Sequence, residues 1–242
     1  MEVDDNASAP DLGATDALRI WKFKVDWANP ANSTFGQFGN PDVVLPVAPF
    51  NVLSCAITGS RNCIPQPGGQ AIDAVGDRLM HRAAYRNFGG YESLVLNHTV
   101  NVGADRAGVR WYEVRNLGSS PSIYQQGTFA PQGNTNRWMA SMAQDRVGNM
   151  ALGYSASSNS LSPSIRYTGR LKGDAVGQMT QGETTLMAGN GYQSGSARWG
   201  DYSSMTLDPT DDCTFWYANQ YVADIETTPD TSGTAGRWRR RI

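Results

Sequence analysis

The sequence predicts an all-β protein, a β-propeller of four-stranded antiparallel blades that is incomplete in one chain, with about three to three and a half blades. One segment recurs, beginning at Arg78, Arg137 and Arg198, so the copies are spaced by 59 and 61 residues. Each copy has the pattern of a short strand, a polar turn and a second strand. A composition with 26 glycines, 12 prolines and only 17 % charged residues suits a turn-rich β protein.

Further strands complete the repeat. The strands predicted after each repeated pair are 108–115, 164–170 and 236–242 in the third position, and 121–129 and 182–189 in the fourth. The stretches 18–27 and 41–50 match the third and fourth strands of an earlier blade. Four strands joined by turns are the unit of a propeller blade.

The predicted organisation is a flexible N-terminal lead-in over 1–17, followed by propeller blades over 18–242. The blades are predicted at 18–50 (partial), 78–130, 137–189 and 198–242 (partial). The chain therefore enters and leaves in mid-blade, which exposes strand edges that invite pairing with another chain. We expect a homodimer that completes the ring, a fragment of a longer protein, or both.

The cysteines indicate an extracytoplasmic protein. Cys55 and Cys63 lie eight residues apart in a turn-rich segment, and the expected disulfide between them favours secretion. Cys213 falls on a predicted strand, either as a buried free thiol or with a partner outside this sequence. Three cysteines without CxxC spacing argue against a zinc site.

Charge and hydropathy exclude two classes of partner. The net charge of −2 offers no general attraction for nucleic acid. No apolar run approaches the roughly 20 residues needed to cross a bilayer. The basic run 237–241 reads as a strand edge or a frayed tail.

Several stretches carry a family resemblance. CIPQPGG, RWMASMAQDRVGNMALGYSASS, PSIRYTGR and RWGDYSSMTLDP resemble an uncharacterised group of bacterial secreted proteins, which are similar at the level of fold to sialidase-like propellers. The resemblance covers about residues 18–242 and implies the fold and secretion, because the group has no assigned activity. The sialidase Asp-box is not present, since 145–149 shares only a polar Asp/Gly turn with it.

Candidate site residues lie where the innermost strands approach the propeller axis, because side chains from every blade converge there. The catalytic candidates are His81, Asp201, Tyr202 and His98, and the substrate-binding candidates are Arg78, Arg82, Arg137, Trp138, Arg198 and Trp199. The arginines could clamp a carboxylate or phosphate, and a histidine suits a general base. A sialidase-type site combines such a clamp with an Asp acid/base and a Tyr nucleophile.

Each candidate also has a structural interpretation. An arginine repeated in every blade, followed by tryptophan in two of the copies, suits packing between blades, and a histidine on a strand often completes a local hydrogen bond. The acids from Asp208 to Asp212 suit solvated turns, but oxygen ligands of this kind also bind calcium. Calcium or another divalent metal is therefore a candidate cofactor whose ligands the sequence does not identify.

Two functions follow. The first is a hydrolase with a polar, metal-assisted site at the propeller mouth, acting on glycosides, lactones or phosphoesters, including phosphotriesters. The second is a non-catalytic propeller that binds glycan or protein at the cell surface through exposed aromatic side chains. Charged residues with perturbed pKa values at the mouth would favour the enzyme. An interior filled by apolar side chains would favour the binding protein.

Overall fold

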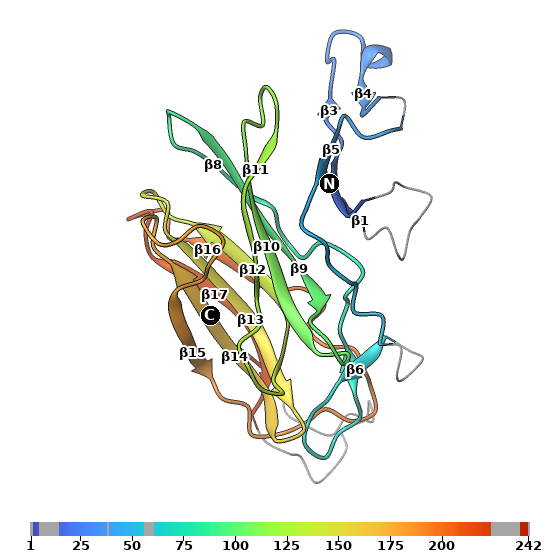
Figure 1. The fold of residues 1–242 in the computed structure, drawn as a ribbon, viewed down its shortest axis with the longest axis vertical. Helices are drawn as coiled ribbons and strands as arrows, with labels where there is room; N and C mark the ends of the chain where they lie inside the picture. The colour runs from blue at the N-terminus through green and yellow to red at the C-terminus, as the bar shows by residue number, and fades with distance from the viewer. Residues whose placement is uncertain (1, 5–14, 38, 56–60, 224–237, 242) are drawn as a thin grey trace.

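Four antiparallel sheets follow one another along the chain, and each packs face to face with the next (Figure 1). The computed structural model describes residues 2–4, 15–37, 39–55, 61–223 and 238–241. The prediction of an all-β protein with four-stranded antiparallel sheets is confirmed. Within the described ranges the helical structure is limited to a short 3-10 turn at Pro30–Asn32. No described helix has the length and apolar character required to cross a membrane.

The two central sheets are complete four-stranded meanders, in which each strand pairs with the next along the chain. The second sheet contains β8 (Ala84–Asn87), β9 (Glu92–Asn101), β10 (Ala107–Arg115) and β11 (Ser122–Phe129). The third sheet contains β12 (Asn136–Gln144), β13 (Met150–Ser158), β14 (Leu161–Arg170) and β15 (Gln181–Met187). These strands fall within the predicted blades 78–130 and 137–189, except that β12 begins one residue earlier, at Asn136.

The end sheets have three strands each. The first contains β1 (Glu2–Asp4), β2 (Ala17–Ile20) and β5 (Val43–Pro46), and the last contains β16 (Ser204–Leu207), β17 (Phe215–Val222) and β18 (Trp238–Arg241). Strand β1 lies inside the predicted lead-in 1–17, where the sequence suggested no strand. Residues 5–14 of that lead-in lie outside the described part of the chain.

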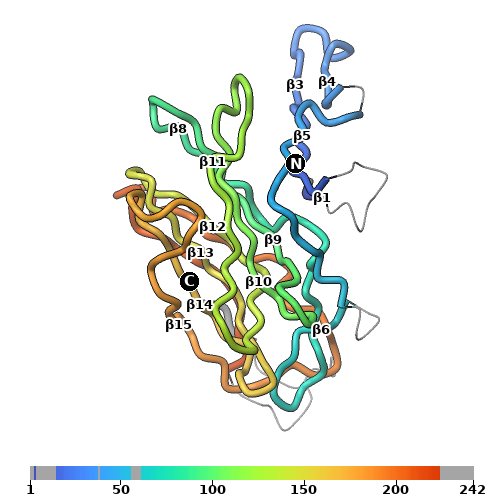
Figure 2. Tube along the Cα trace, in the orientation of Figure 1, coloured from blue at the N-terminus to red at the C-terminus, as the bar shows by residue number. Residues whose placement is uncertain are grey.

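Two small hairpins interrupt this order, one between β2 and β5 of the first sheet and one between the first and second sheets. They are β3 (Phe23–Lys24) with β4 (Thr34–Phe35), and β6 (Asn62–Ile64) with β7 (Ile72–Asp73). The β3–β4 hairpin extends beyond the first sheet at the upper end of the molecule (Figure 2). The β6–β7 hairpin contains Cys63, which forms the expected disulfide with Cys55.

Apolar side chains fill the spaces between neighbouring sheets, because alternate residues of a strand point to the same face. Leu18 and Leu45 of the first sheet pack against Leu96 and Tyr112 of the second. Between the second and third sheets the buried side chains are Val95, Val109, Trp111, Ala140, Met142, Met150, Leu152, Tyr154 and Ala156. Ala143, Ile165, Met205 and Tyr217 fill the space between the third and last sheets.

The recurring segment marks the start of the first strand of a sheet in only one of its three copies. Arg137 lies inside β12, but the strands after Arg78 and Arg198 begin six residues later, at Ala84 and Ser204. Gly200 and Asp201 both have positive φ angles, so the backbone turns before β16 can begin. These two irregular segments lie beside the candidate site.

Candidate functional site

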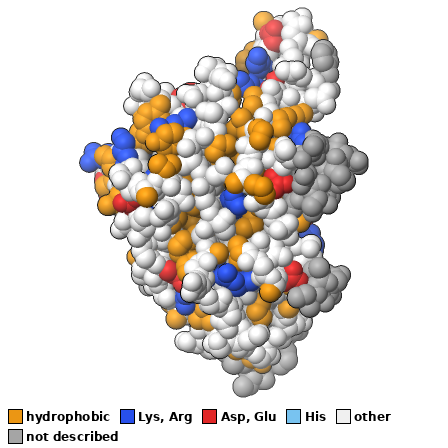
Figure 3. Space-filling model, in the orientation of Figure 1, with side chains coloured by type: hydrophobic (Ala, Val, Ile, Leu, Met, Phe, Trp, Pro, Cys, Tyr) orange, Lys and Arg blue, Asp and Glu red, His pale blue; other side chains and the backbone are white. Residues whose placement is uncertain are grey.

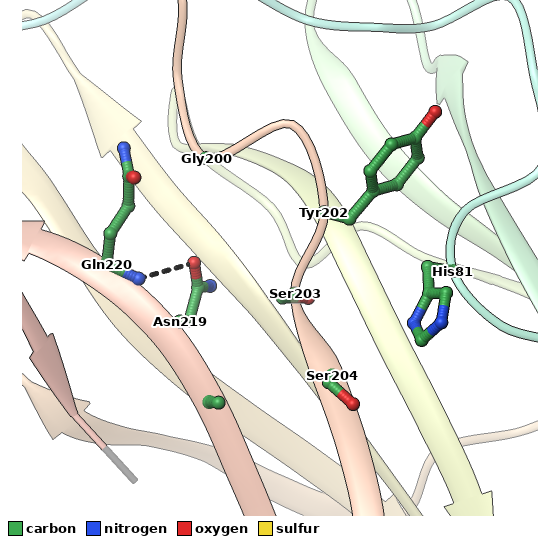
Figure 4. Close-up of a pocket in the computed structure, with 8 residues that line it drawn as sticks. His81, Gly200, Tyr202, Ser203, Ser204, Asn219 and Gln220 are labelled. Atoms are coloured by element: carbon green, nitrogen blue, oxygen red, sulfur yellow. Dashed lines mark hydrogen bonds between the residues drawn. The ribbon is translucent and has the colours of Figure 1, made fainter.

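A hollow of about 530 Å³ lies between the segment before β8 and the last sheet (Figure 4). Its lining residues are His81, Gly200, Tyr202, Ser203, Ser204, Ala218, Asn219 and Gln220. Because Tyr217 packs towards the third sheet, the alternate residues Ala218 and Gln220 of β17 point to the opposite face. Ser203 and Asn219, whose side chains bond towards the third sheet, complete the lining, so the hollow borders the free face of β17 without being confined to it.

His81 and Tyr202 are the two aromatic side chains of the hollow. Their ring centroids are 6.5 Å apart, and the ring planes are inclined by 60°. His81 is exposed, and Tyr202 is about half exposed. The fold thus brings together two of the four predicted catalytic residues, although they lie about 120 residues apart in the sequence.

Polar groups surround these rings. The backbone N–H of Gln220 donates to Oδ1 of Asn219 at 2.8 Å, as Figure 4 shows. Nδ2 of Asn219 donates to the hydroxyl oxygens of Ser155 and Tyr217, so its orientation is fixed by buried partners. Nε2 of Gln220 has no hydrogen-bond partner within the described structure.

The charged residues Arg78 and Arg198, predicted for the site, lie beside the hollow, and each pairs with an aspartate close in sequence. The guanidinium of Arg198 contacts the carboxylate of Asp201. Arg78 binds Asp77 at 2.8 Å, and this hydrogen bond lowers the pKa of the Asp77 carboxyl. Seven of the eight lining residues have uncharged side chains, and the eighth is His81. The hollow therefore presents hydroxyl, amide and aromatic groups to a ligand.

His98 lies in the core, away from the hollow. Its Nε2 is 2.9 Å from the hydroxyl oxygen of Tyr112, and the two rings stack with centroids 5.6 Å apart. Burial, together with the positive charge of Arg110, lowers the pKa of His98 to about 3. We therefore correct the predicted catalytic role of His98, because a sealed, neutral imidazole cannot reach a substrate and instead supports the second sheet.

Arg137 is also a core residue. Its Nε lies 2.5 Å from Oε2 of Glu183, whose carboxylate also contacts Arg166 and accepts a 2.9 Å hydrogen bond from the Tyr154 hydroxyl. Burial alone would raise the pKa of Glu183, but the hydrogen bonds and charge of Arg137 more than offset that effect and lower it. The predicted substrate clamp at Arg137 is therefore replaced by an internal ion cluster that joins β12, β14 and β15.

The repeated tryptophans fill the interior. Trp138 and Trp199 are completely buried, with ring centroids 6.2 Å apart. Nε1 of Trp199 donates to the Ser155 hydroxyl at 3.1 Å. Both belong to the cluster that surrounds the disulfide-linked Cys55. The prediction that these tryptophans contact substrate is corrected, because no solvent reaches either ring.

Arg82 lines a second hollow, of about 450 Å³, which lies beside β8, β12 and β16, the first strands of the last three sheets. The other side of this hollow is formed by Gln144 at the end of β12 and Thr206 in β16. Its second arginine, Arg86, pairs with Asp212 and donates from Nε to the Gln144 carbonyl at 2.9 Å. Arg82 is exposed, so the structure does not place it in the same lining as His81 and Tyr202.

The acidic turn between β16 and β17 uses its carboxylates locally. Asp208 accepts from the backbone N–H of Thr210 at 2.8 Å, and Asp211 accepts from those of Cys213 and Thr214 at 2.9 Å. Within the described ranges, no group of three or more His, Cys, Asp or Glu residues has the arrangement of a metal site. Calcium remains an untested prediction. Cys213 lies exposed in this turn as a free cysteine.

Ser204, Asn219 and Gln220 of the hollow were not predicted from the sequence. They occupy positions of β16 and β17 that carry no motif, and only the pairing of these strands brings them together. Comparison of the chain with family models, with curated proteins and with solved structures found no match to any of them. The candidate site therefore rests on its own geometry.

Proposed function

We propose that this protein is a non-catalytic binding module whose site is the hollow between His81 and the free face of β16 and β17. The ligand class is a neutral, hydroxyl-rich molecule such as a glycan. The observation that carries the proposal is the pairing of Tyr202 and His81 rings with uncharged hydrogen-bonding side chains in one open hollow. Aromatic faces contact the apolar side of a sugar, and amides and hydroxyls bind its hydroxyl groups.

The interior supports binding rather than catalysis. Trp138 and Trp199 fill the space where the repeated inner segments converge, and Arg137 is held by Glu183. A glycosidase of the usual type needs two carboxyl groups about 5–9.5 Å apart across the bond that it cleaves. Asp201 is the nearest acid in sequence to the hollow, and it contacts Arg198 instead of lining the cavity.

The architecture proposed for this module is an arc of a β-propeller. Consecutive four-stranded meanders that pack face to face, with their first strands on the same side, are the arrangement that a propeller repeats around its axis. The Cys55–Cys63 disulfide supports a proposed extracytoplasmic location. Both agree with the resemblance to bacterial secreted propeller proteins.

A hydrolase is the second candidate, supported by the proximity of His81 to Tyr202 and Ser204 in one hollow. A histidine near hydroxyl groups is the basis of nucleophilic catalysis. Within the described structure, however, no hydrogen bond joins His81 to either hydroxyl. The hydrolase would therefore need the ligand itself to tighten this arrangement.

Glycan-array screening followed by calorimetric titration tests the proposal. We expect the wild type to bind a neutral glycan, and Tyr202→Ala to weaken that binding at least tenfold, because it removes the larger ring of the hollow. Tyr124→Ala is the matched control, since Tyr124 is similarly exposed but lies on β11. Equal affinity for both variants, or no glycan binding by the wild type, would contradict the proposal.

A substrate panel separates the two candidates. Chromogenic glycosides, esters and phosphotriesters are incubated with the wild type and with His81→Ala, each with and without EDTA. The binding module predicts no turnover of any substrate. Turnover that His81→Ala abolishes would establish the hydrolase instead, and its sensitivity to EDTA would reveal the metal-assisted form.

A further inference from the structure

The β3–β4 hairpin carries the most exposed aromatic side chains of the described structure. Trp27 is 88 % exposed, Phe23 70 % and Phe35 57 %. The Phe35 ring lies parallel to that of Trp21 and edge-on to that of Phe23, with centroids 6.4 and 6.5 Å apart. We call the described residues 21–37 and 39–40 the aromatic hairpin. Exposed aromatic groups gathered on one projecting element usually indicate a contact with another molecule.

The aromatic hairpin is ordered by its own hydrogen bonds. Nε1 of Trp21 donates to the Gly39 carbonyl at 2.8 Å, and the Asp26 carboxylate accepts from the backbone N–H groups of Ala28 and Asn29. The backbone N–H of Lys22 donates to Asp42 at 2.6 Å, which ties the hairpin to the first sheet. Figure 3 shows hydrophobic and basic side chains together at this end of the molecule. The exposed rings are thus presented in a fixed arrangement.

An apolar groove lies at the other end of the row of sheets. It has a volume of about 390 Å³ and is lined by Ala151, Tyr167, Leu186, Met205, Phe215, Trp216 and Tyr217. Tyr167, Leu186 and Trp216 are each about two-fifths to one-half exposed. The groove is open because β18 pairs only with Asn219–Val222, and the first half of β17 has no described strand on that side.

We propose that a second copy of this chain occupies the groove, with the aromatic hairpin of each copy docked into the groove of the other. The hairpin lies beside the first sheet, and the groove lies between the third and last sheets, on opposite sides of the molecule (Figure 1). A two-fold axis that closes a ring places the first sheet of one copy next to the last sheet of its partner. The same operation therefore makes both hairpin–groove contacts.

The area available is sufficient for a stable dimer. An aromatic side chain buries about 150–250 Å² when fully covered. Covering the exposed parts of Phe23, Trp27 and Phe35, and of the groove residues, in both copies removes on the order of 1,500 Å² of apolar surface from water. Specific interfaces bury about 1,200–2,000 Å², so these contacts alone reach the required range.

Analytical ultracentrifugation of three variants tests the docking. We expect the wild type to have about twice the 26.2 kDa mass of one chain. Phe23→Ser/Trp27→Ser in the hairpin and Leu186→Asp in the groove should each give monomers. Val176→Ser, at an exposed apolar position between β14 and β15, should remain a dimer. A mixture of the hairpin and groove variants leaves one hairpin–groove contact intact, about half of the apolar area, so it should give heterodimers that are weaker than the wild-type dimer.

Two results would overturn the proposal. A monomeric wild type would exclude a second copy as the occupant of the groove, and a hairpin variant that dimerises like the wild type would place the interface elsewhere. If Leu186→Asp fails to fold, cross-linking in a Cys213→Ser background replaces it. Phe23→Cys chains should then form interchain disulfides with Leu186→Cys chains but not with Val176→Cys chains. The hairpin variants retain Tyr202, so glycan binding can be measured independently of assembly.

Discussion

Replacing Glu183 by glutamine tests whether the internal ion cluster stabilises the third sheet. The side chain of Arg137 is only 4 % exposed, and that of Glu183 is 17 % exposed. Glutamine keeps the shape of the side chain but removes the charge that faces Arg137 and Arg166. Removing one partner of a buried pair typically costs about 3–5 kcal/mol. We expect a loss near the lower end of that range, because Arg166 is partly exposed.

The assay is urea unfolding of the wild type and Glu183→Gln between neutral and acid pH. Because the folded protein lowers the pKa of Glu183, the stability that this group contributes is present above the ordinary pKa of Glu. It is lost as the pH falls through the lowered value. The difference between the two proteins should therefore be largest near neutral pH and shrink in acid.

Glu92→Gln is the matched control. Glu92 accepts hydrogen bonds from the Tyr85 hydroxyl and the Gly118 backbone N–H at the surface, so its replacement should change the free energy of unfolding by about 1 kcal/mol or less. A Glu183→Gln protein as stable as this control at neutral pH would refute the stabilising role of the cluster.

Two further predictions concern the core. The imidazole of His98, whose pKa burial lowers to about 3, should show no protonation by NMR between about pH 5 and 8, and protonation of the unfolded chain should reduce stability below about pH 6.5. Gly153→Ala should lower the free energy of unfolding by about 1–3 kcal/mol in urea titration, because the new methyl would lie 2.5 Å from the Tyr217 ring. Gly182→Ala, with open space around it, should unfold like the wild type. Protonation of His98 in the folded protein at pH 6, or equal stability of the two glycine variants, would contradict these assignments.

The sequence predicted the two central sheets well because the segment repeats there and its turns carry their own signals. Gly148, for example, adopts the positive φ that the predicted turn between β12 and β13 requires. The end sheets were harder to predict, since β1 is short and its pairing with β2 depends on contacts distant in sequence. The sequence does not predict the aromatic hairpin, because the pattern over 18–27 indicates one continuous strand. In the structure this stretch is divided between β2 and β3.

The candidate site was predicted only in part. His81 and Tyr202 are predicted as site residues because they differ between copies of the repeat, and the fold brings them together. The Arg-Trp pair occurs in two copies of the repeat, and the two tryptophans pack against each other in the core, which is a structural role that resembles a binding motif in sequence. The contributions of Ser204 and Gln220 depend on strand pairing and on which face of β17 is free, and no local pattern encodes either.

The most direct test of the proposed site is NMR observation of the two histidine imidazoles during titration with a bound glycan. The chain has only two histidines, and they lie in opposite environments. His81 lines the hollow, whereas His98 is sealed in the core beside Tyr112. We predict that saturating glycan shifts the resonances of His81 and leaves those of His98 unchanged. Unchanged His81 resonances at saturation would contradict the placement of the binding site in this hollow.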